Sequence, residues 1–152
     1  DWSWSRGLGD VYKRQGMITV TNNFASDVVT WEEAIHDYDR SMKEGLEVKS
    51  STPPGFFVTH NINYLPKVKK ILDKLTYSVA HLYCNLTTLA PTFGEHADNV
   101  NVCFWQCQGE TKWVIEEKDY ILKPGDLIFV PKGVKHNVIP LTPRLGISMS
   151  KT

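Results

Sequence analysis

The chain has 152 residues, 41% of them hydrophobic, and its 17 lysines and arginines balance 17 aspartates and glutamates. A net charge of zero gives no electrostatic preference for nucleic acid or an anionic membrane, so either partner would need a local patch. No apolar run reaches the ~20 residues that a membrane-spanning helix needs, and the length suits one domain with a single core.

The first fifteen residues stand apart from the rest of the sequence. Residues 10–15 read DVYKRQ, which resembles a translated adapter from metagenomic sequencing, and the residues before them show no hydrophobic pattern. We expect residues 1–15 to be a non-native scar and Met17 to be the natural start; a native disordered arm is the alternative. No signal-peptide pattern follows Met17.

Residues 16–75 are predicted to form a cover of helices and short strands. Thr30 followed by Glu33 is a capping-box pattern, and apolar residues then recur at helical spacing as far as Gly45. The predicted inward-facing stripe consists of Trp31, Ala34, Ile35, Tyr38 and Met42. The pattern therefore predicts an amphipathic helix that packs across the outside of a sheet.

A short strand at 56–59 and a second helix complete this cover. Pro66 occupies a position that a first helical turn accepts, and the helix is expected to end at Leu75. Its lysines are Lys67, Lys69, Lys70 and Lys74. They form either a solvated outer face or an anion-binding surface.

From residue 76 to residue 152 the hydrophobic period changes to two. The β-rich stretches are 77–86, 100–107, 112–115, 120–122, 127–130, 137–139 and 145–150, with turns between them and no helical pattern. Such a series of short strands predicts an antiparallel sandwich or barrel as the core.

The three cysteines, Cys84, Cys103 and Cys107, lie within predicted strands. Their odd number favours reduced thiols over a disulfide framework, and no second pair or histidine completes a zinc spacing. We therefore expect packed core thiols in a cytoplasmic protein.

Three potential metal ligands lie in the predicted barrel. His96 and Asp98 are two residues apart, so in an extended strand both side chains point to the same side. His136 follows a buried strand and a Pro/Gly turn. Two imidazoles and one carboxylate form the facial set that holds Fe(II) with open positions, whereas His60 and His81 are expected to be structural.

The order and spacing of two motifs resemble those of the JmjC and cupin-like iron oxygenases of the cupin superfamily. The first motif comprises His96, Asp98, Gln106, Gly109, Lys112 and Trp113, and the second comprises Gly125, Pro131, Gly133 and His136. The likeness covers roughly residues 79–150, with Pro140 where the second cupin motif usually has asparagine.

This resemblance implies a mainly all-β fold, a double-stranded β-helix or cupin jelly roll, with a short N-terminal helical cover. It also implies Fe(II) at His96, Asp98 and His136, with 2-oxoglutarate as cosubstrate. A common metal cupin would have a His-x-His pair and a following glutamate, so the aspartate at position 98 favours an oxygenase.

An anchor for the distal carboxylate of 2-oxoglutarate is expected to be a cation, best an arginine. The lysine of the JmjC-like pattern falls at Thr111 here, and Lys112 is shifted by one. Arg144, eight residues after His136, is the alternative, because many 2-oxoglutarate oxygenases have an arginine about that far along. Further residues expected to line the cavity are Tyr83, Asn85 and Asn101.

The sequence thus predicts an Fe(II)/2-oxoglutarate-dependent dioxygenase, a hydroxylase acting on a small-molecule or protein substrate that the sequence does not identify. Two alternatives remain open: a non-oxygenase metal cupin that isomerises or binds a small molecule, and a non-catalytic binding or assembly module. A homodimer and a missing C-terminal piece are both compatible with the sequence.

Overall fold

A computed structural model describes residues 17–50 and 55–151, so the predicted scar at 1–15 lies outside the described residues. The elements are β1 (Thr19–Thr21), α2 (Trp31–Lys43), β2 (Val48–Ser50), β3 (Phe56–Thr59), α3 (Pro66–Leu75), β4 (Val79–Asn85), β5 (Val102–Gln108), β6 (Thr111–Ile115), β7 (Lys118–Leu122), β8 (Leu127–Val130), β9 (His136–Pro140) and β10 (Arg144–Ser150).

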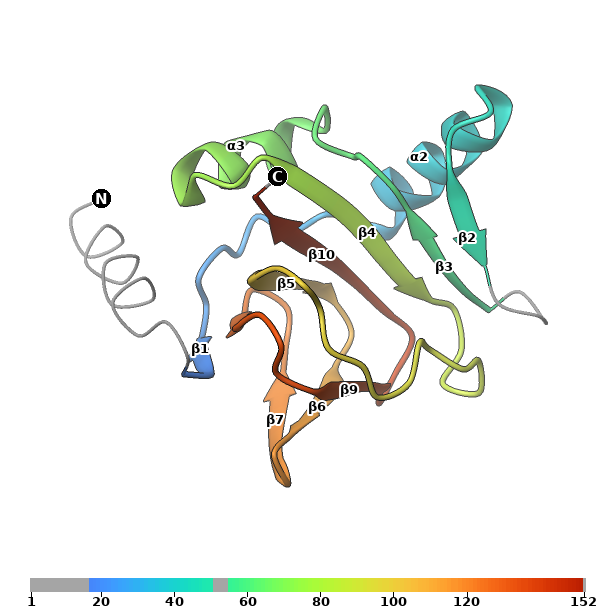
Figure 1. Cartoon of the computed structure of the whole chain (residues 1–152). Coiled ribbons are helices and arrows are strands. Elements are labelled where there is room, and N and C mark those ends of the chain that lie inside the picture. Colours follow the sequence, from blue (N-terminus) through green and yellow to red (C-terminus); the bar gives the residue numbers. More distant parts are fainter. Residues whose placement is uncertain (1–16, 51–54, 152) are drawn as a thin grey trace.

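The strands form two antiparallel sheets. The larger has the order β1-β8-β5-β10-β4-β3-β2 and the smaller the order β7-β6-β9. Figure 1 shows α2 and α3 on the side of the large sheet that faces away from the small sheet. This is the mainly β, double-stranded β-helix with a helical cover that the sequence predicts.

The two faces of the large sheet carry different residues because side chains alternate along each strand. On β4, Ala80, Leu82 and Cys84 belong to the core cluster that packs against the helices. Tyr83 points to the opposite face, where it packs, partly buried, against the hydrophobic clusters between the two sheets. The side chains of β4 that face the space between the sheets, such as Tyr83, therefore come from its odd-numbered positions.

The cover helix α2 begins as predicted and packs Trp31, Ala34 and Tyr38 against the core, but its buried stripe is rotated away from the predicted Ile35 and Met42. Thr30 Oγ1 accepts a hydrogen bond from the Glu33 amide, and Glu33 Oε1 accepts one from the Thr30 amide, each 3.1 Å long. The buried side chains are Ala34, Asp37 and Ser41, whereas Ile35 and Met42 are each 55% exposed. Neighbouring stripes of a helix differ by only ~100° of rotation, so periodicity did not determine which stripe meets the sheet.

The second helix, α3, is tied to α2 by one of its lysines. Lys67 Nζ lies 2.8 Å from Glu33 Oε1 and donates to the carbonyl of Val28 at 3.1 Å. This lysine therefore holds the cover together rather than forming a free basic surface. Neither α2 nor α3, the helices of the described part, is long and apolar enough to cross a membrane.

The three thiols are free and buried, as expected. Cys84, Cys103 and Cys107 all belong to the cluster between the large sheet and the helices. They face away from the space between the two sheets, so they belong to packing and not to the site.

Candidate metal centre and its cavity

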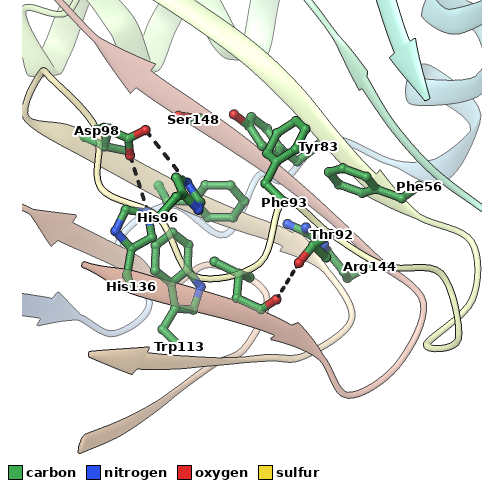
Figure 2. Close-up of a pocket in the computed structure, with 13 residues that line it drawn as sticks. Phe56, Tyr83, Thr92, Phe93, His96, Asp98, Trp113, His136, Arg144 and Ser148 are labelled. Carbon is green, nitrogen blue, oxygen red and sulfur yellow. Dashed lines mark hydrogen bonds and ion pairs between the residues drawn. The ribbon is translucent and has the colours of Figure 1, made fainter. Parts of the chain in front are cut away.

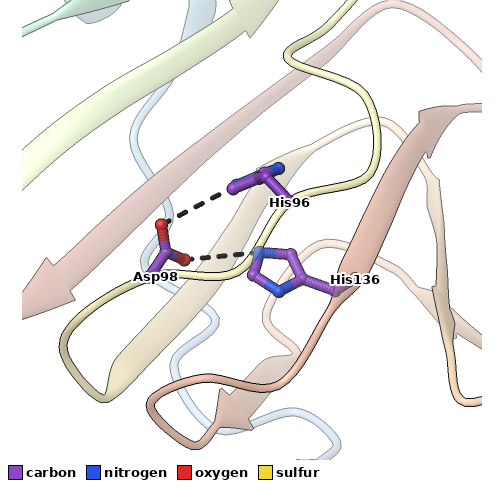
Figure 3. A group of neighbouring side chains, drawn as sticks. All are labelled: His96, Asp98 and His136. Carbon is purple, nitrogen blue, oxygen red and sulfur yellow. Dashed lines mark ion pairs between the residues drawn. The ribbon is translucent and has the colours of Figure 1, made fainter.

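The three predicted ligands come together at one end of the space between the sheets. His136 opens β9, and His96 and Asp98 lie in the connection between β4 and β5. The expectation that His96 and Asp98 lie in a regular strand is wrong, since His96 forms only an isolated bridge to His136. The turn and loop residues around them form too few backbone hydrogen bonds with a neighbouring strand to make a strand. The side chains of His96 and Asp98 still point to the same side (Figure 3).

The backbone holds this connection against β9. His96 and His136 exchange a pair of amide-to-carbonyl hydrogen bonds of 3.0 and 2.9 Å, and the Gly133 amide donates to the Asp98 carbonyl at 2.9 Å. The ligand-bearing loop is therefore fixed at both ligand positions although it is irregular.

The side-chain geometry suits a cation. One ligand atom from each of the three residues lies within 4.8 Å of the others. Asp98 faces both imidazoles, with Oδ1 3.8 Å from His96 Nε2 and Oδ2 3.4 Å from His136 Nε2. No other group of three such ligands is found among residues 17–50 and 55–151.

Both imidazoles are oriented in the same way. His96 Nδ1 lies 2.8 Å from the Gly94 carbonyl and His136 Nδ1 lies 2.9 Å from the Val134 carbonyl. A carbonyl accepts a hydrogen bond from Nδ1–H, so the neutral imidazole has its lone pair on Nε2, the atom that would bind a metal ion. Both Nε2 atoms face Asp98, so the donor set matches the two histidines and one carboxylate of a facial metal site.

The charges of the trio support one another in the metal-free protein. The hydrogen bond from His136 holds the pKa of the Asp98 carboxyl below its ordinary value. Burial lowers the pKa of His136, but hydrogen bonds to Asp98 and to the Val134 carbonyl outweigh burial and leave this pKa raised. The indole of Trp113 stacks on the His136 ring, with centroids 5.5 Å apart.

A cavity leads from the trio to a buried arginine at its other end (Figure 2). Its wall is largely aromatic, formed by Phe56, Tyr83, Phe93, Phe104 and Trp113. These rings contact one another at centroid distances of 5.1 to 6.3 Å. An apolar wall with polar groups at its two ends is the usual composition of a small-molecule site.

Arg144 lies at the start of β10 and is only 1% exposed. Its Nε donates to Asn85 Oδ1 at 2.7 Å, while its Nη1 is buried without a partner. Burial lowers the pKa of the guanidinium to about 10, so it stays charged at neutral pH. The Cζ atom of the guanidinium lies 5.7 to 5.9 Å from the ring centroids of Phe56, Tyr83 and Phe104.

Of the other residues predicted to bind the cosubstrate, some line the cavity and others do not. Tyr83 lines the cavity, but Lys112, Thr111 and Asn101 do not. On β6 the side chain of Lys112 alternates with Trp113, so it points away from the cavity. Thr111 is buried, with its hydroxyl donating to Gln106 at 3.0 Å. Asn101 accepts from the Lys132 amide at 2.8 Å instead of facing the cavity.

Two residues of the site were missed or undervalued. Phe93 lies in the ligand loop and places its ring edge-on to His96, with centroids 6.2 Å apart. No sequence signal marks it, because loop geometry decides its direction. Asn85 was expected only to line the cavity, whereas it holds Arg144. His60 and His81 pack against each other away from the cavity, with tilted rings whose centroids are 4.5 Å apart, and His81 accepts a hydrogen bond from the Asn61 amide.

The part of the chain that carries all three ligands matches a known domain family. Residues 85–143 match the family model of the Cupin domain, so the predicted resemblance to cupins is confirmed for this part of the chain. No curated protein matches the chain.

Solved structures share this fold at low sequence identity. Ribosomal oxygenase YcfD from Escherichia coli, in complex with cobalt and 2-oxoglutarate, superposes with a TM-score of 0.74 at 15% identity, over 93% of this chain. Only 50% of the YcfD chain is covered, so this chain spans about half its length. Salicylate 1,2-dioxygenase from Pseudoaminobacter salicylatoxidans superposes with a TM-score of 0.50 at 17% identity, over 81% of this chain and 32% of its own.

Proposed function

We propose that this protein is an Fe(II)- and 2-oxoglutarate-dependent oxygenase, a hydroxylase. The observation that carries the proposal is one cavity with a His/Asp/His trio at one end and a buried, charged arginine without an acidic partner at the other. A cosubstrate with a chelating 2-oxoacid group and a distal carboxylate has matching chemistry at both ends.

Each residue of the cavity has a role in this proposal. His96, Asp98 and His136 hold Fe(II) and leave positions open for cosubstrate and oxygen. When bound, the iron and 2-oxoglutarate supply oxygen activation coupled to oxidative decarboxylation. Arg144 binds the distal carboxylate, a role that Lys112 does not share because it points away.

Tyr83 and the aromatic wall prepare the cavity for this ligand. Burial and the charge of Asp98 raise the pKa of the Tyr83 phenol, so the phenol stays protonated and able to donate a hydrogen bond. The rings of Phe56 and Phe104 exclude water beside Arg144, which strengthens its attraction for a carboxylate.

The structural relatives support the choice of cofactor. YcfD is a ribosomal oxygenase whose structure contains cobalt and 2-oxoglutarate, and cobalt as a divalent ion suits the same ligand types as Fe(II). The free, buried thiols support a reducing compartment, and we propose the cytoplasm.

The test is conversion of 2-oxoglutarate to succinate by protein purified anaerobically and supplied with Fe(II) and ascorbate. The matched control is His96→Ala, which lacks a ligand. Turnover that depends on His96 supports the oxygenase. Metal binding without turnover indicates a non-oxygenase metal cupin, and no metal binding indicates a non-catalytic module.

A further inference from the structure

The guanidinium of Arg144 is buried where a protein interior ordinarily provides an acid. It is 1% exposed, and within the described residues it has no ion pair. Its Nη1 has no hydrogen-bond partner. A buried charge without an opposite charge is destabilising, so its retention points to a ligand that supplies the missing negative charge.

Asn85 is the side chain that holds this guanidinium. It ends β4 and lies directly opposite Arg144 on β10. Its Oδ1 accepts from Nε at 2.7 Å, while its own Nδ2 is buried without a partner. The reverse amide orientation would set donor against donor, so the hydrogen bond fixes the assignment.

The buried polar side chains of the neighbouring turn, Gln106 and Thr111, are neutral. Gln106 donates to the Gly109 carbonyl at 3.0 Å and accepts from Thr111. A Cβ on Gly109 would lie 3.0 Å from the Arg144 Cα, so the turn that this amide holds packs against the backbone of Arg144. Among the described residues, Asp98 is the only carboxylate that lines the cavity, and it belongs to the metal trio.

We propose that Asn85 is a positioning residue that orients Arg144 through a neutral hydrogen bond and so leaves the full guanidinium charge for a carboxylate ligand. An aspartate in its place would hold Arg144 equally well but would neutralise it. The identity of the ligand, the distal carboxylate of 2-oxoglutarate, rests on the proposed function.

The test is Asn85→Asp, with Asn22→Asp as a control that adds the same charge at an exposed turn. In Asn85→Asp the new ion pair raises the unfolding temperature of the ligand-free protein. At the same time it weakens 2-oxoglutarate binding to the Co(II)-loaded protein roughly tenfold or more, measured by titration calorimetry. Co(II) affinity and the affinity for pyruvate, which lacks a distal carboxylate, stay unchanged.

A purely structural asparagine would give a different result. Asn85→Asp that is no more stable than wild type, or that binds 2-oxoglutarate within roughly twofold of wild type, overturns the proposal. Asn85→Ala lowers both stability and 2-oxoglutarate affinity, because it removes the orienting oxygen.

Failure of the proposed function is distinguishable from failure of this inference. Wild-type protein that binds 2-oxoglutarate and glutarate but forms no succinate overturns the oxygenase alone. Succinate formation that Asn85→Asp leaves intact overturns the role of Asn85 alone. Wild-type protein that binds neither dicarboxylate overturns both.

Discussion

At the scale of single residues, the metal trio depends on the orientation of its imidazoles. His96 and His136 each turn Nε2 toward Asp98 because Nδ1 is bound to a nearby carbonyl. Removal of one ligand leaves two, which is too few to hold the ion firmly. The two histidines are therefore expected to be individually indispensable for binding.

We predict that His96→Ala weakens Co(II) binding by more than ~100-fold. Losing only a hydrogen bond that supports a ligand typically weakens metal binding by ~10- to 100-fold, and this variant loses the ligand itself. The exposed His36→Ala is the matched control and should bind Co(II) like wild type. Titration calorimetry measures both affinities. Equal affinities of the two variants would show that the ion binds elsewhere.

The wall of the cavity depends on the absence of a side chain at position 146. A Cβ on Gly146 would lie 2.1 Å from Phe104 Cε1 and Cζ, a separation that is not tolerated. Gly146→Ala therefore displaces the Phe104 ring, which should lower the free energy of unfolding by about 1–3 kcal/mol and weaken 2-oxoglutarate binding.

A double-mutant cycle tests whether this effect passes through the ring. In Phe104→Leu the smaller side chain leaves room, so adding Gly146→Ala should then have much less effect on stability, as measured by urea denaturation. Independent, additive losses would place the strain elsewhere in β10.

The residues themselves were predicted with uneven success. His96, Asp98 and His136 were recognisable because their chemical type and spacing match a ligand set. The choice between Lys112 and Arg144 stayed open, since it depends on which way β6 faces. The role of Asn85 requires the register of β4 against β10, which no local pattern encodes.

At the scale of elements, α2 carries an unusual buried acid. Asp37 is 1% exposed and both of its carboxylate oxygens lack hydrogen bonds, although Arg40 lies 3.7 Å away. Burial raises the pKa of Asp37, and the charge of Arg40 only partly offsets this. Ionisation therefore destabilises the folded state.

We predict that Asp37→Asn raises the free energy of unfolding at pH 7 by roughly 1 kcal/mol. Because the pKa of Asp37 is higher in the folded than in the unfolded state, its ionisation destabilises the fold as the pH rises from the unfolded to the folded pKa. Below pH 3.8, the ordinary pKa of the carboxyl, both states are protonated, so the stability gained by Asp37→Asn should vanish there. Urea denaturation across pH measures this. Exposed Asp39→Asn is the control, and a gain at low pH instead would contradict the prediction.

Most strands were predictable, whereas the ligand loop was not. The continuous apolar run at 127–130 gave β8 with its observed bounds, and the other predicted β-rich stretches differ from the observed strands by a few residues, but β1 and β2 were not predicted. The spacing of His96 and Asp98 predicts an extended segment, because side chains two residues apart point to the same side of a strand. The shape of this loop is set by hydrogen bonds to His136 and Gly133, which lie far along the chain.

At the scale of the whole molecule, the trio joins the two halves of the fold. His136 belongs to the small sheet, while His96 and Asp98 lie on the connection into β5 of the large sheet. An ion held by all three binds only the folded chain, so binding adds directly to the stability of the fold.

We predict that Co(II) at about 100 times its dissociation constant adds about 2.7 kcal/mol to the free energy of unfolding. For a chain of this size the unfolding temperature should rise by about 5–10 °C, as followed by calorimetry. His136→Ala should show no rise. An equal rise in that variant would mean that the ion acts at another site.

The paired backbone bonds between His96 and His136 have a spectroscopic consequence. Each histidine gives its amide proton to the carbonyl of the other, so neither proton can be replaced by deuterium until both bonds open together. Once the intrinsic exchange rate of each amide is divided out, the two amides should therefore show one common protection factor in heavy water. That factor reports the free energy with which the ligand loop parts from β9, whatever molecule the cavity contains.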